Sequence, residues 1–254
     1  HLPKSVFDLE KWQAAVSPEY RKKVVYVLNR GGRFDDFAAA FDGKQLKNKY
    51  GKQINMYIEK LAKAKNSISG KGFSSIATHL PIADSQGNII EDEKDGFSLN
   101  LITYREMAQC KSRTISNYWL LSLLPENFIL LNSLDAQRLG LRNGDSVRVI
   151  SKTNPAGEWD LKGAGKKPMI GRLKVIEGIR PGVTAFSLGH GHWAYGSRDI
   201  FIDGRRVIAD KRRGTGIHAN AAMRLDPYLK NVCLQDLVGA SVAFYDTNVN
   251  LVKV

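Results

Sequence analysis

Hydroxyl, amide and cationic side chains gather in one segment, which begins in an apolar stretch of strand length, Phe97–Arg105. Ammonium and guanidinium groups beside hydroxyl donors are common partners of phosphate in proteins. We therefore expect this segment to bind a phosphorylated ligand, although a surface loop that precedes a helix could have the same composition. The residues concerned are Lys111, Ser112, Arg113 and Thr114.

The next segment predicts a strand, a short helix, a turn and a second strand. Phe128–Leu131 is an apolar run of strand length, and Val147–Ile150 alternates apolar and polar residues. The spacing predicts a helix over 133–139, with Ser133 as its N-cap. Asp135 would lie in the first helical turn, where the helix dipole stabilises an acid without any ligand.

Two histidines, His190 and His192, lie in a glycine-rich segment after a predicted strand, and Trp193 follows them. Histidines two residues apart share one face of a strand and could form part of a metal site. The neighbouring sequence supplies no carboxylate or thiolate to complete that site, so we expect no metal here. Glycine-rich backbone beside an aromatic side chain favours a loop that contacts a flat ligand or lines a substrate funnel.

Strand patterns dominate after a domain boundary that we place near residue 96. Short apolar runs separated by Gly, Pro and Asn-Gly turns favour a mainly β domain with few helices, over residues 96–254. Within this domain we expect a hairpin at 154–169, a helix around 116–123, and closing strands at Ala240–Tyr245 and Val249–Val254.

Residues 1–95 are expected to form a smaller α/β segment that belongs to a preceding domain. Val24–Leu28 predicts a buried strand, whereas Phe34–Phe41 and Tyr50–Lys65 predict helices. Two glycines after the strand could cradle a phosphate, but a plain strand-to-helix turn has the same pattern.

The composition is that of a basic globular protein of 254 residues with a formal net charge of +13. The basic residues are scattered and lack interleaved aromatic residues, which argues against a nucleic-acid platform. We find no apolar run long enough to cross a membrane and no signal peptide. Cys110 and Cys233 lack the spacing of a zinc or iron–sulfur site, so we expect two separate buried thiols, although a single disulfide stays open.

Two blocks of the chain together resemble the C-terminal cofactor-binding domain of the molybdopterin oxidoreductase large subunits, the dimethyl sulfoxide reductase family. The resemblance covers about residues 97–254, and residues 24–75 are similar to the stretch before this domain in the tetrathionate-reductase branch. The first block holds Asn132, Asp135-Ala136, Leu139-Gly140, Gly144-Asp145 and Val147-x-Val149, and the second holds Val175, Gly178 and Pro181-Gly182.

This resemblance implies a six-stranded double-psi β-barrel that binds molybdopterin guanine dinucleotide. Asn132 and Asp135 match the guanine-reading pair of the family, because a carboxylate can accept hydrogen bonds from the Watson–Crick edge of guanine. His190, His192 and Trp193 match a segment that contacts the pterin. Asn220 would also bind the pterin, and Asp226 would shape the adjoining turn. The first segment resembles a family loop that holds the dinucleotide and the pterin, and the residues that match it are Thr103, Gln109, Ser112, Thr114, Trp119 and, approximately, Asn117.

The resemblance further implies part of the catalytic subunit of a molybdenum or tungsten oxidoreductase, most like tetrathionate reductase. Such an enzyme cleaves the sulfur–sulfur bond of tetrathionate to give thiosulfate. Another sulfur, arsenic or selenium oxyanion reductase of the family is the alternative. The metal ligand and the iron–sulfur cysteines lie upstream in the family, so we expect no catalytic residue in this fragment and no activity from it alone.

The implied partners are an anionic small-molecule substrate, the rest of the large subunit, an iron–sulfur electron-transfer subunit, and a membrane anchor subunit. By the same resemblance, an extracytoplasmic location is expected. A hypothesis of a different class is a basic barrel that serves as a binding module for nucleic acid or protein. The ordered polar motifs argue against it, because a simple adaptor would not need them.

Overall fold

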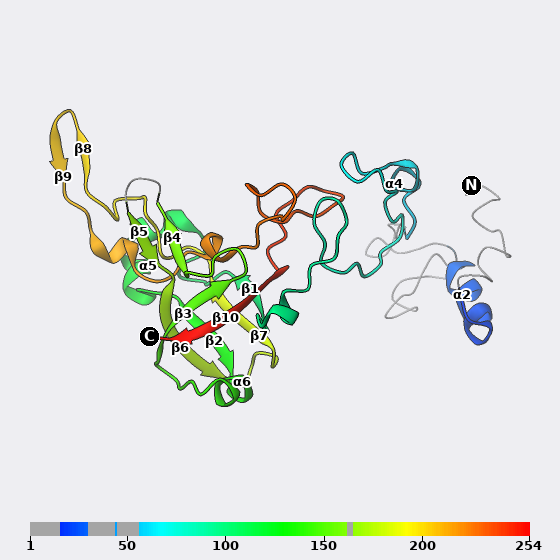
Figure 1. The fold of residues 1–254 in the computed structure, drawn as a ribbon, viewed down its shortest axis with the longest axis horizontal. Helices are drawn as coiled ribbons and strands as arrows, with labels where there is room; N and C mark the ends of the chain where they lie inside the picture. Colours follow the sequence, from blue (N-terminus) through cyan, green and yellow to red (C-terminus); the bar gives the residue numbers. More distant parts are fainter. Residues whose placement is uncertain (1–15, 30–43, 45–55, 162–164) are drawn as a thin grey trace. The chain divides into compact units, whose positions relative to one another are not determined.

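The computed structural model describes residues 16–29, 44, 56–161 and 165–254. It divides the chain into two compact units, the first formed by residues 1–64 and 72–78, the second by residues 65–71 and 79–254. The second unit contains the strands of the barrel (Figure 1). Residues 79–95, which we had assigned to the N-terminal segment, group with this second unit.

The described helices of the first unit are α2 (Pro18–Asn29) and α4 (Glu59–Lys63). The strand predicted at Val24–Leu28 was wrong, because this run belongs to α2, which Pro18 begins with a φ angle suited to a first helical turn. The helix predicted at Tyr50–Lys65 is reduced to α4 among the described residues. The helix predicted at Phe34–Phe41 and the glycines before it lie outside them.

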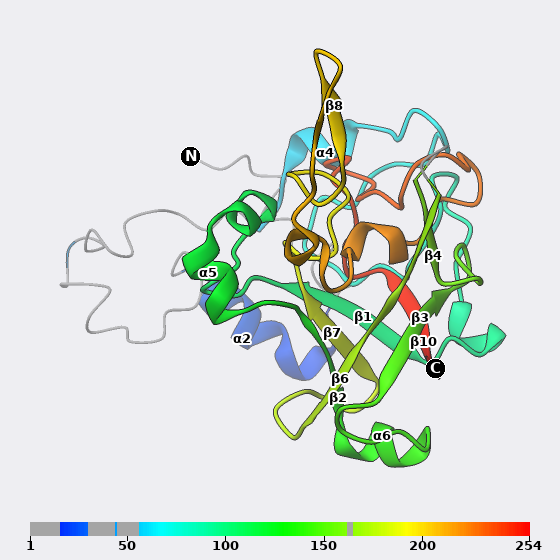
Figure 2. The same ribbon diagram turned by 90° about the vertical axis from the view of Figure 1, so that its left-hand side faces the viewer.

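Six strands of the second unit close into a barrel in the order β1-β10-β3-β6-β2-β7 (Figures 1 and 2). The pairs β1–β7 and β2–β6 are parallel, and the other neighbours are antiparallel. The closed six-stranded barrel expected from the sequence is confirmed. Its strands are β1 (Leu99–Tyr104), β2 (Phe128–Asn132), β3 (Ser146–Ser151), β6 (Ile170–Ile176), β7 (Val183–Ser187) and β10 (Thr247–Lys253).

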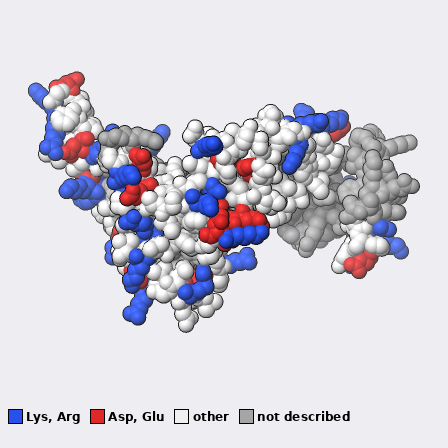
Figure 3. All heavy atoms as spheres, in the orientation of Figure 1, with Lys and Arg blue, Asp and Glu red and all other residues white. Residues whose placement is uncertain are grey.

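Charged side chains are spread over the second unit. On the face shown in Figure 3, basic and acidic side chains lie interspersed. This distribution agrees with the scattered basic residues in the sequence.

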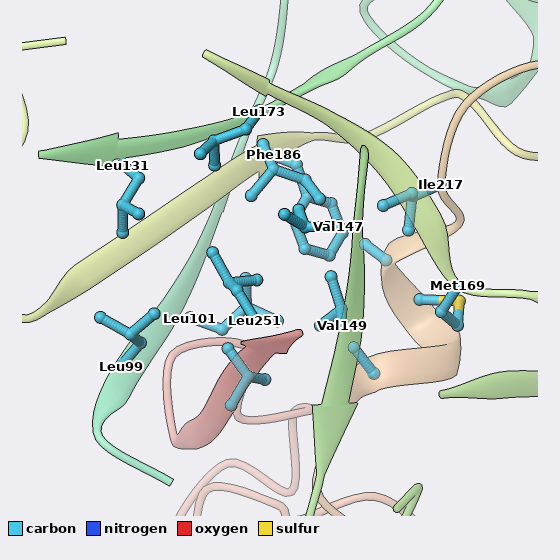
Figure 4. Packing of buried hydrophobic residues seen from close by; sticks show 14 of the residues in the cluster. Leu99, Leu101, Leu131, Val147, Val149, Met169, Leu173, Phe186, Ile217 and Leu251 are labelled. Carbon is cyan, nitrogen blue, oxygen red and sulfur yellow. The ribbon is translucent and has the colours of Figure 1, made fainter. Parts of the chain in front are cut away.

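The barrel interior is filled by the side chains that alternate inward along each strand. Leu99 and Leu101 of β1 and Phe186 of β7 are fully buried (Figure 4). The alternation follows from the two-residue period of a strand, which sends one set of side chains to the core and the other outward. Val147, Val149, Leu173, Leu131 and Leu251 complete the same cluster.

Short helices and hairpins connect the barrel strands. They are η3 (Asp92–Asp95), η4 (Ser112–Ser116), α5 (Tyr118–Leu123), α6 (Ser133–Arg138), the hairpin β4–β5 (Glu158–Asp160, Lys166–Pro168), the hairpin β8–β9 (Ile200–Ile202, Arg205–Val207), η5 (Lys211–Gly214) and η6 (Ala219–Ala222). The predicted hairpin at 154–169 and helix near 116–123 are confirmed. No helix in the described part of the chain has the length and apolar character needed to cross a membrane.

Two local predictions were wrong. Asn132, rather than Ser133, caps α6, because its side-chain oxygen accepts a hydrogen bond from Leu134 N at 2.9 Å. The predicted strand Ala240–Tyr245 is replaced by turns, with one isolated bridge between Gln235 and Val242. The Asp236 side chain accepts hydrogen bonds from the backbone just before this run, which favours a turn over a strand.

A buried ion pair fastens residues 79–95 to the barrel unit. The Arg224 guanidinium donates to both oxygens of Asp92, at 2.6 and 3.1 Å. Both side chains are more than nine-tenths buried. Since water cannot screen this contact, each charge depends on the other.

Replacement of Arg224 by Met should lower the free energy of unfolding by about 3–5 kcal/mol, because the Asp92 carboxylate would stay buried without its partner. The double variant Asp92→Leu/Arg224→Met removes both charges and should recover most of this loss. Urea titrations of both proteins measure the difference. Lys152→Met breaks the exposed ion pair with Asp95 and should cost less than about 1 kcal/mol. A double variant as unstable as the single one would contradict this account.

Candidate functional site

Three of the four predicted groups of polar residues meet at one end of the barrel. β1 and β7 end there side by side, with Tyr104 paired to Ser187. Beyond β7, Gly189 lies against the first predicted segment, so that a Cβ on it would come within 3.3 Å of the Lys111 backbone. Gly191 lies as close to the backbone of Ile217 and His218. The segments that carry Gln109, His190 and Asn220 are therefore neighbours.

Asn127, just before β2, holds this end of the barrel together. Its amide nitrogen donates to Ser187 O at 2.7 Å and to Ile217 O at 3.0 Å, and its oxygen accepts from Ile217 N at 2.9 Å. Gly216 passes so near that an added Cβ would lie 2.3 Å from the Asn127 oxygen. Its φ of +79° also favours glycine. One amide thus connects three segments of the chain.

Aromatic and imidazole rings form the wall of this site. The His192 ring packs edge-to-face against His218, with centroids 5.0 Å apart, and against Tyr195 at 5.3 Å. Trp159, from β4, packs against His218, with the ring centroids 4.4 Å apart. The rings therefore hold one another in fixed orientations.

Several buried polar atoms at this site have no hydrogen-bond partner in the described part of the protein. Buried polar atoms are almost always paired in folded proteins, so a group of unpaired ones indicates a ligand. Gln109 and His190 are fully or almost fully buried, and His192 is only 7% exposed. The atoms are Gln109 Nε2, Ser187 Oγ, both ring nitrogens of His190 and His192 Nε2.

Burial keeps the imidazoles of the site neutral near pH 7. It lowers the pKa of His190 to about 4, with a smaller contribution from the nearby His192. It likewise lowers the pKa of His218 to about 4. Burial also lowers the pKa of Lys167 to about 8, and the ammonium of this lysine donates to Gly214 O. A neutral imidazole offers one donor and one acceptor, as a heterocyclic ligand with both kinds of atom requires.

The donors and acceptors present fit a pterin. A pterin ring carries amide, amine and ring-nitrogen groups, and Gln109, Ser187 and His190 present unpaired groups of both kinds. The described residues contain no group of three or more His, Cys, Asp or Glu that could hold a metal ion. The unpaired groups named above can hydrogen-bond a polar ring.

The first predicted segment is divided between the site and the surface. Thr103 is buried in β1, and Thr114 Oγ1 donates to Gln109 Oε1 at 2.6 Å. Asn117 caps α5 by accepting hydrogen bonds from Trp119 N and Leu120 N. Ser112 is half-buried, whereas Lys111 and Arg113 are exposed. The two cations are therefore free to meet a charged group from solvent.

The other predicted residues of the site lie at its edge. Trp193 is half-buried, with the Arg198 guanidinium 5.0 Å from its ring centroid. Asn220 is exposed in η6, and its backbone N–H donates to Nδ1 of His218. Their predicted contacts with the pterin stay predictions.

Asn132 and Asp135 lie at the opposite end of β2 from Asn127 and the histidines. The Asn132 amide nitrogen donates to Ile179 O at 2.7 Å. One oxygen of Asp135 accepts from Gly182 N at 2.6 Å, and the other from Arg138. These bonds secure α6 and the turn before β7, so the guanine-reading role assigned to this pair stays a prediction.

Asp226 has a structural environment. It is buried, and its oxygens accept hydrogen bonds from Ser85 N and Oγ at 2.8 and 2.6 Å, and from Tyr228 N and Leu229 N. Burial alone would raise its pKa, but these donors outweigh it and lower the pKa. The carboxylate thus forms the turn expected of it and, in addition, anchors the segment around Ser85.

Four residues of the site escaped the sequence analysis: Asn127, Lys167, Ser187 and His218. His218 precedes Asn220 by two residues, so the motif around Asn220 was the signal that could have included it. Nothing in the local sequence marks Asn127. The two cysteines are free as expected, but neither is fully buried, since Cys110 is exposed and Cys233 is half-buried.

His190 should make the stability of the protein depend on pH. Because its folded pKa of about 4 lies below the ordinary 6.5, the folded chain binds fewer protons than the unfolded chain between these values. Stability should therefore be complete above pH 6.5 and decline as the pH falls towards 4. Urea titrations across this range should show a weaker decline for His190→Gln. The same change at the exposed His79 is the control, and an equal effect of both variants would contradict this assignment.

Comparison with known proteins identifies the family of this domain. The Molydopterin dinucleotide binding domain model matches residues 99–236, more than half of the chain. The chain is 48% identical over its whole length to a selenate reductase subunit of Mesobacillus selenatarsenatis, of which it covers 24%. It is 27% identical, over 87% of its length, to a tetrathionate reductase subunit of Salmonella typhimurium, of which it covers 21%.

The chain thus spans a quarter or less of the length of these curated relatives. Among solved structures, acetylene hydratase from Pelobacter acetylenicus matches 70% of this chain and 21% of its own, with a TM-score of 0.46 and 16% identity. The family match covers β1, the loop with Gln109, and the segments with His190 and His218. The chain accordingly belongs to the molybdopterin dinucleotide-binding domains of the dimethyl sulfoxide reductase family.

Proposed function

We propose that this chain is part of the catalytic polypeptide of a molybdenum or tungsten oxidoreductase that reduces an oxyanion, with selenate as the first candidate. Its own task is to hold one molybdopterin guanine dinucleotide. The observation that carries this proposal is the group of buried, unpaired polar atoms at one end of the barrel.

The residues of the site would bind and orient the cofactor. When bound, the cofactor supplies the two-electron chemistry of the metal. Gln109, Ser187 and His190 would hydrogen-bond the pterin, since their free groups are already buried and oriented. The exposed cations Lys111 and Arg113 would meet the pyrophosphate.

Similarity favours selenate over tetrathionate as the substrate. The chain is 48% identical to a selenate reductase subunit, compared with 27% and 29% to two tetrathionate reductase subunits. Tetrathionate, which we first expected, is therefore the second candidate. Arsenate is the third, since arsenate respiratory reductase subunits match at 30% and 28% identity over 41% of the chain.

The wider assembly follows from the same proposal. We expect the rest of the catalytic polypeptide to carry an iron–sulfur cluster and the metal ligand. We also expect two further subunits, one for iron–sulfur electron transfer and one for membrane anchoring, with the assembly at an extracytoplasmic location. Nucleic acid is not among the expected partners.

The substrate can be tested with the full-length protein. Oxidation of a reduced viologen should be fastest with selenate, slower with tetrathionate or arsenate, and absent in protein prepared without molybdenum or tungsten. The chain of 254 residues alone should show no turnover. Faster turnover of tetrathionate than of selenate would reverse the order proposed, and activity without either metal would reject the function.

The role of Gln109 can be tested by two measurements that should respond differently. Gln109→Leu removes a buried nitrogen that has no partner, but it also removes the oxygen that accepts from Thr114 Oγ1, so the stability of the cofactor-free chain in urea should change by less than about 1 kcal/mol. The same change removes a donor to the pterin, and the cofactor should bind about tenfold more weakly, which is about 1.4 kcal/mol. Cofactor content of the purified full-length protein measures this second effect.

The matched control is Gln137→Leu, on the exposed side of α6. It should leave cofactor content unchanged. A parallel loss of stability and cofactor in Gln109→Leu would indicate a structural role only.

A further inference from the structure

The β8–β9 hairpin projects from the barrel unit with all six of its strand residues exposed (Figures 1 and 2). A two-stranded hairpin is marginally stable in water by itself. This one is nevertheless well formed at both ends. At its tip, Asp203 and Gly204 have φ of 50° and 75°, as in the two-residue turn that suits hairpin twist.

The base of the hairpin is fixed by one carboxylate. Asp199 accepts hydrogen bonds from Ala209 N at 2.7 Å and from Arg206 Nε at 2.8 Å. The hairpin is thus held in place before anything binds to it. Preorganised strands reduce the entropy cost of docking.

Cross-strand pairing sorts the hairpin side chains onto two faces. Ile200 pairs with Val207 and Ile202 with Arg205, so these four residues share one face, which we call the aliphatic face. Its three apolar residues are 40%, 45% and 53% exposed, for Ile200, Val207 and Ile202. The opposite face holds the pair Phe201 and Arg206.

The charges indicate what the aliphatic face binds. Arg206 is neutralised by Asp199, but Arg205 has no ion pair with any described residue. The face therefore presents an apolar surface beside one unpaired cation. Its complement is an apolar surface with a carboxylate positioned opposite Arg205.

Three kinds of occupant are disfavoured by the same residues. A membrane would be entered by the tip, where the Asp203 carboxylate would be costly to bury. A second copy packed on the same face would bring a second unpaired Arg205 where the face requires a carboxylate. A separate protein needs about 20–30 residues on each side of a standard interface, far more than this face offers.

A surface of the same polypeptide does not need so large a contact. Tethering replaces the entropy cost of association by a high effective concentration, so a few apolar residues and one ion pair suffice. We propose that the aliphatic face docks onto another domain of the longer catalytic polypeptide, at an apolar surface that carries a carboxylate. This inference rests on the proposed function only in requiring that longer polypeptide.

A photo-cross-linking residue in place of Ile202, in the full-length protein, tests the occupant. The expected product is an internal cross-link to a peptide outside these 254 residues, next to an acidic residue. A cross-link to another protein, to a second copy or to lipid would overturn the proposal, and so would reaction with water alone.

Trypsin gives an independent readout, since it cleaves after Arg205 and Arg206. In the full-length protein, Ile202→Glu should expose this site and raise the cleavage rate about tenfold, as the loss of a buried interface contact does. Phe201→Glu, on the opposite face, is the matched control and should leave the rate unchanged. Equal effects of the two variants would overturn the choice of face.

Metal content and reductase activity are measured on the same samples. If the wild-type protein lacks metal but the hairpin cross-links as expected, the proposed function fails and the docking stands. If the metal is present but the cross-linking residue reacts only with water, the docking proposal fails and the proposed function stands.

Discussion

The side-chain amide of Asn127 is the constraint on which the site depends. It closes the end of the barrel by joining the end of β7 to the segment around Ile217. The amide nitrogen donates two of these hydrogen bonds and the amide oxygen accepts the third. Gly216 can pass beside it only because it lacks a side chain. This arrangement brings His218 against His192, although the β8–β9 hairpin lies between the two residues in the sequence. In this closed β scaffold, one buried hydrogen-bonded amide thus helps to fix the orientation of several rings.

Some buried residues of the site do not favour the stability of the fold by themselves. Gln109 and His190 are buried with groups that no described atom satisfies, a cost that packing must offset. By contrast, Asn127 and Asp226 are equally buried and fully hydrogen-bonded. The difference separates two kinds of buried polar residue in one domain. Those with complete partners build the fold, and we propose that those with free groups in the site bind the cofactor.

Several strands of the barrel could be predicted because they follow local rules, whereas their closure into a six-stranded barrel was expected only from the resemblance to a known family. The alternation in β1 and β3, and the glycine turn between α6 and β3, depend on neighbouring residues, and so they were visible without coordinates. The predictions failed where tertiary context decided. The apolar run Val24–Leu28 has the composition of a strand, but the preceding Pro18 starts a helix that continues through it. A hydrophobic run alone cannot distinguish the two.

Site residues divide in the same way. His190 and Gln109 were found because their motifs resemble those of a known family, whereas Asn127 and Lys167 act through contacts with distant segments. Asp135 shows the converse problem, because a carboxylate in a first helical turn has the same sequence pattern whether it reads a base or holds a turn. Its bonds to Gly182 and Arg138 are visible only in three dimensions.

The charge of the site also limits what this part of the chain can do. A dianion such as selenate or tetrathionate needs cations, yet burial keeps His190 and His218 neutral at pH 7. Lys167 donates to Gly214 O, and although burial lowers its pKa to about 8, it is still mainly protonated at pH 7. Neutral imidazoles bind a neutral polar ring better than an anion, because they need not be protonated first. The buried part of the site therefore suits the ring of the proposed cofactor, whereas the exposed cations Lys111 and Arg113 suit its pyrophosphate.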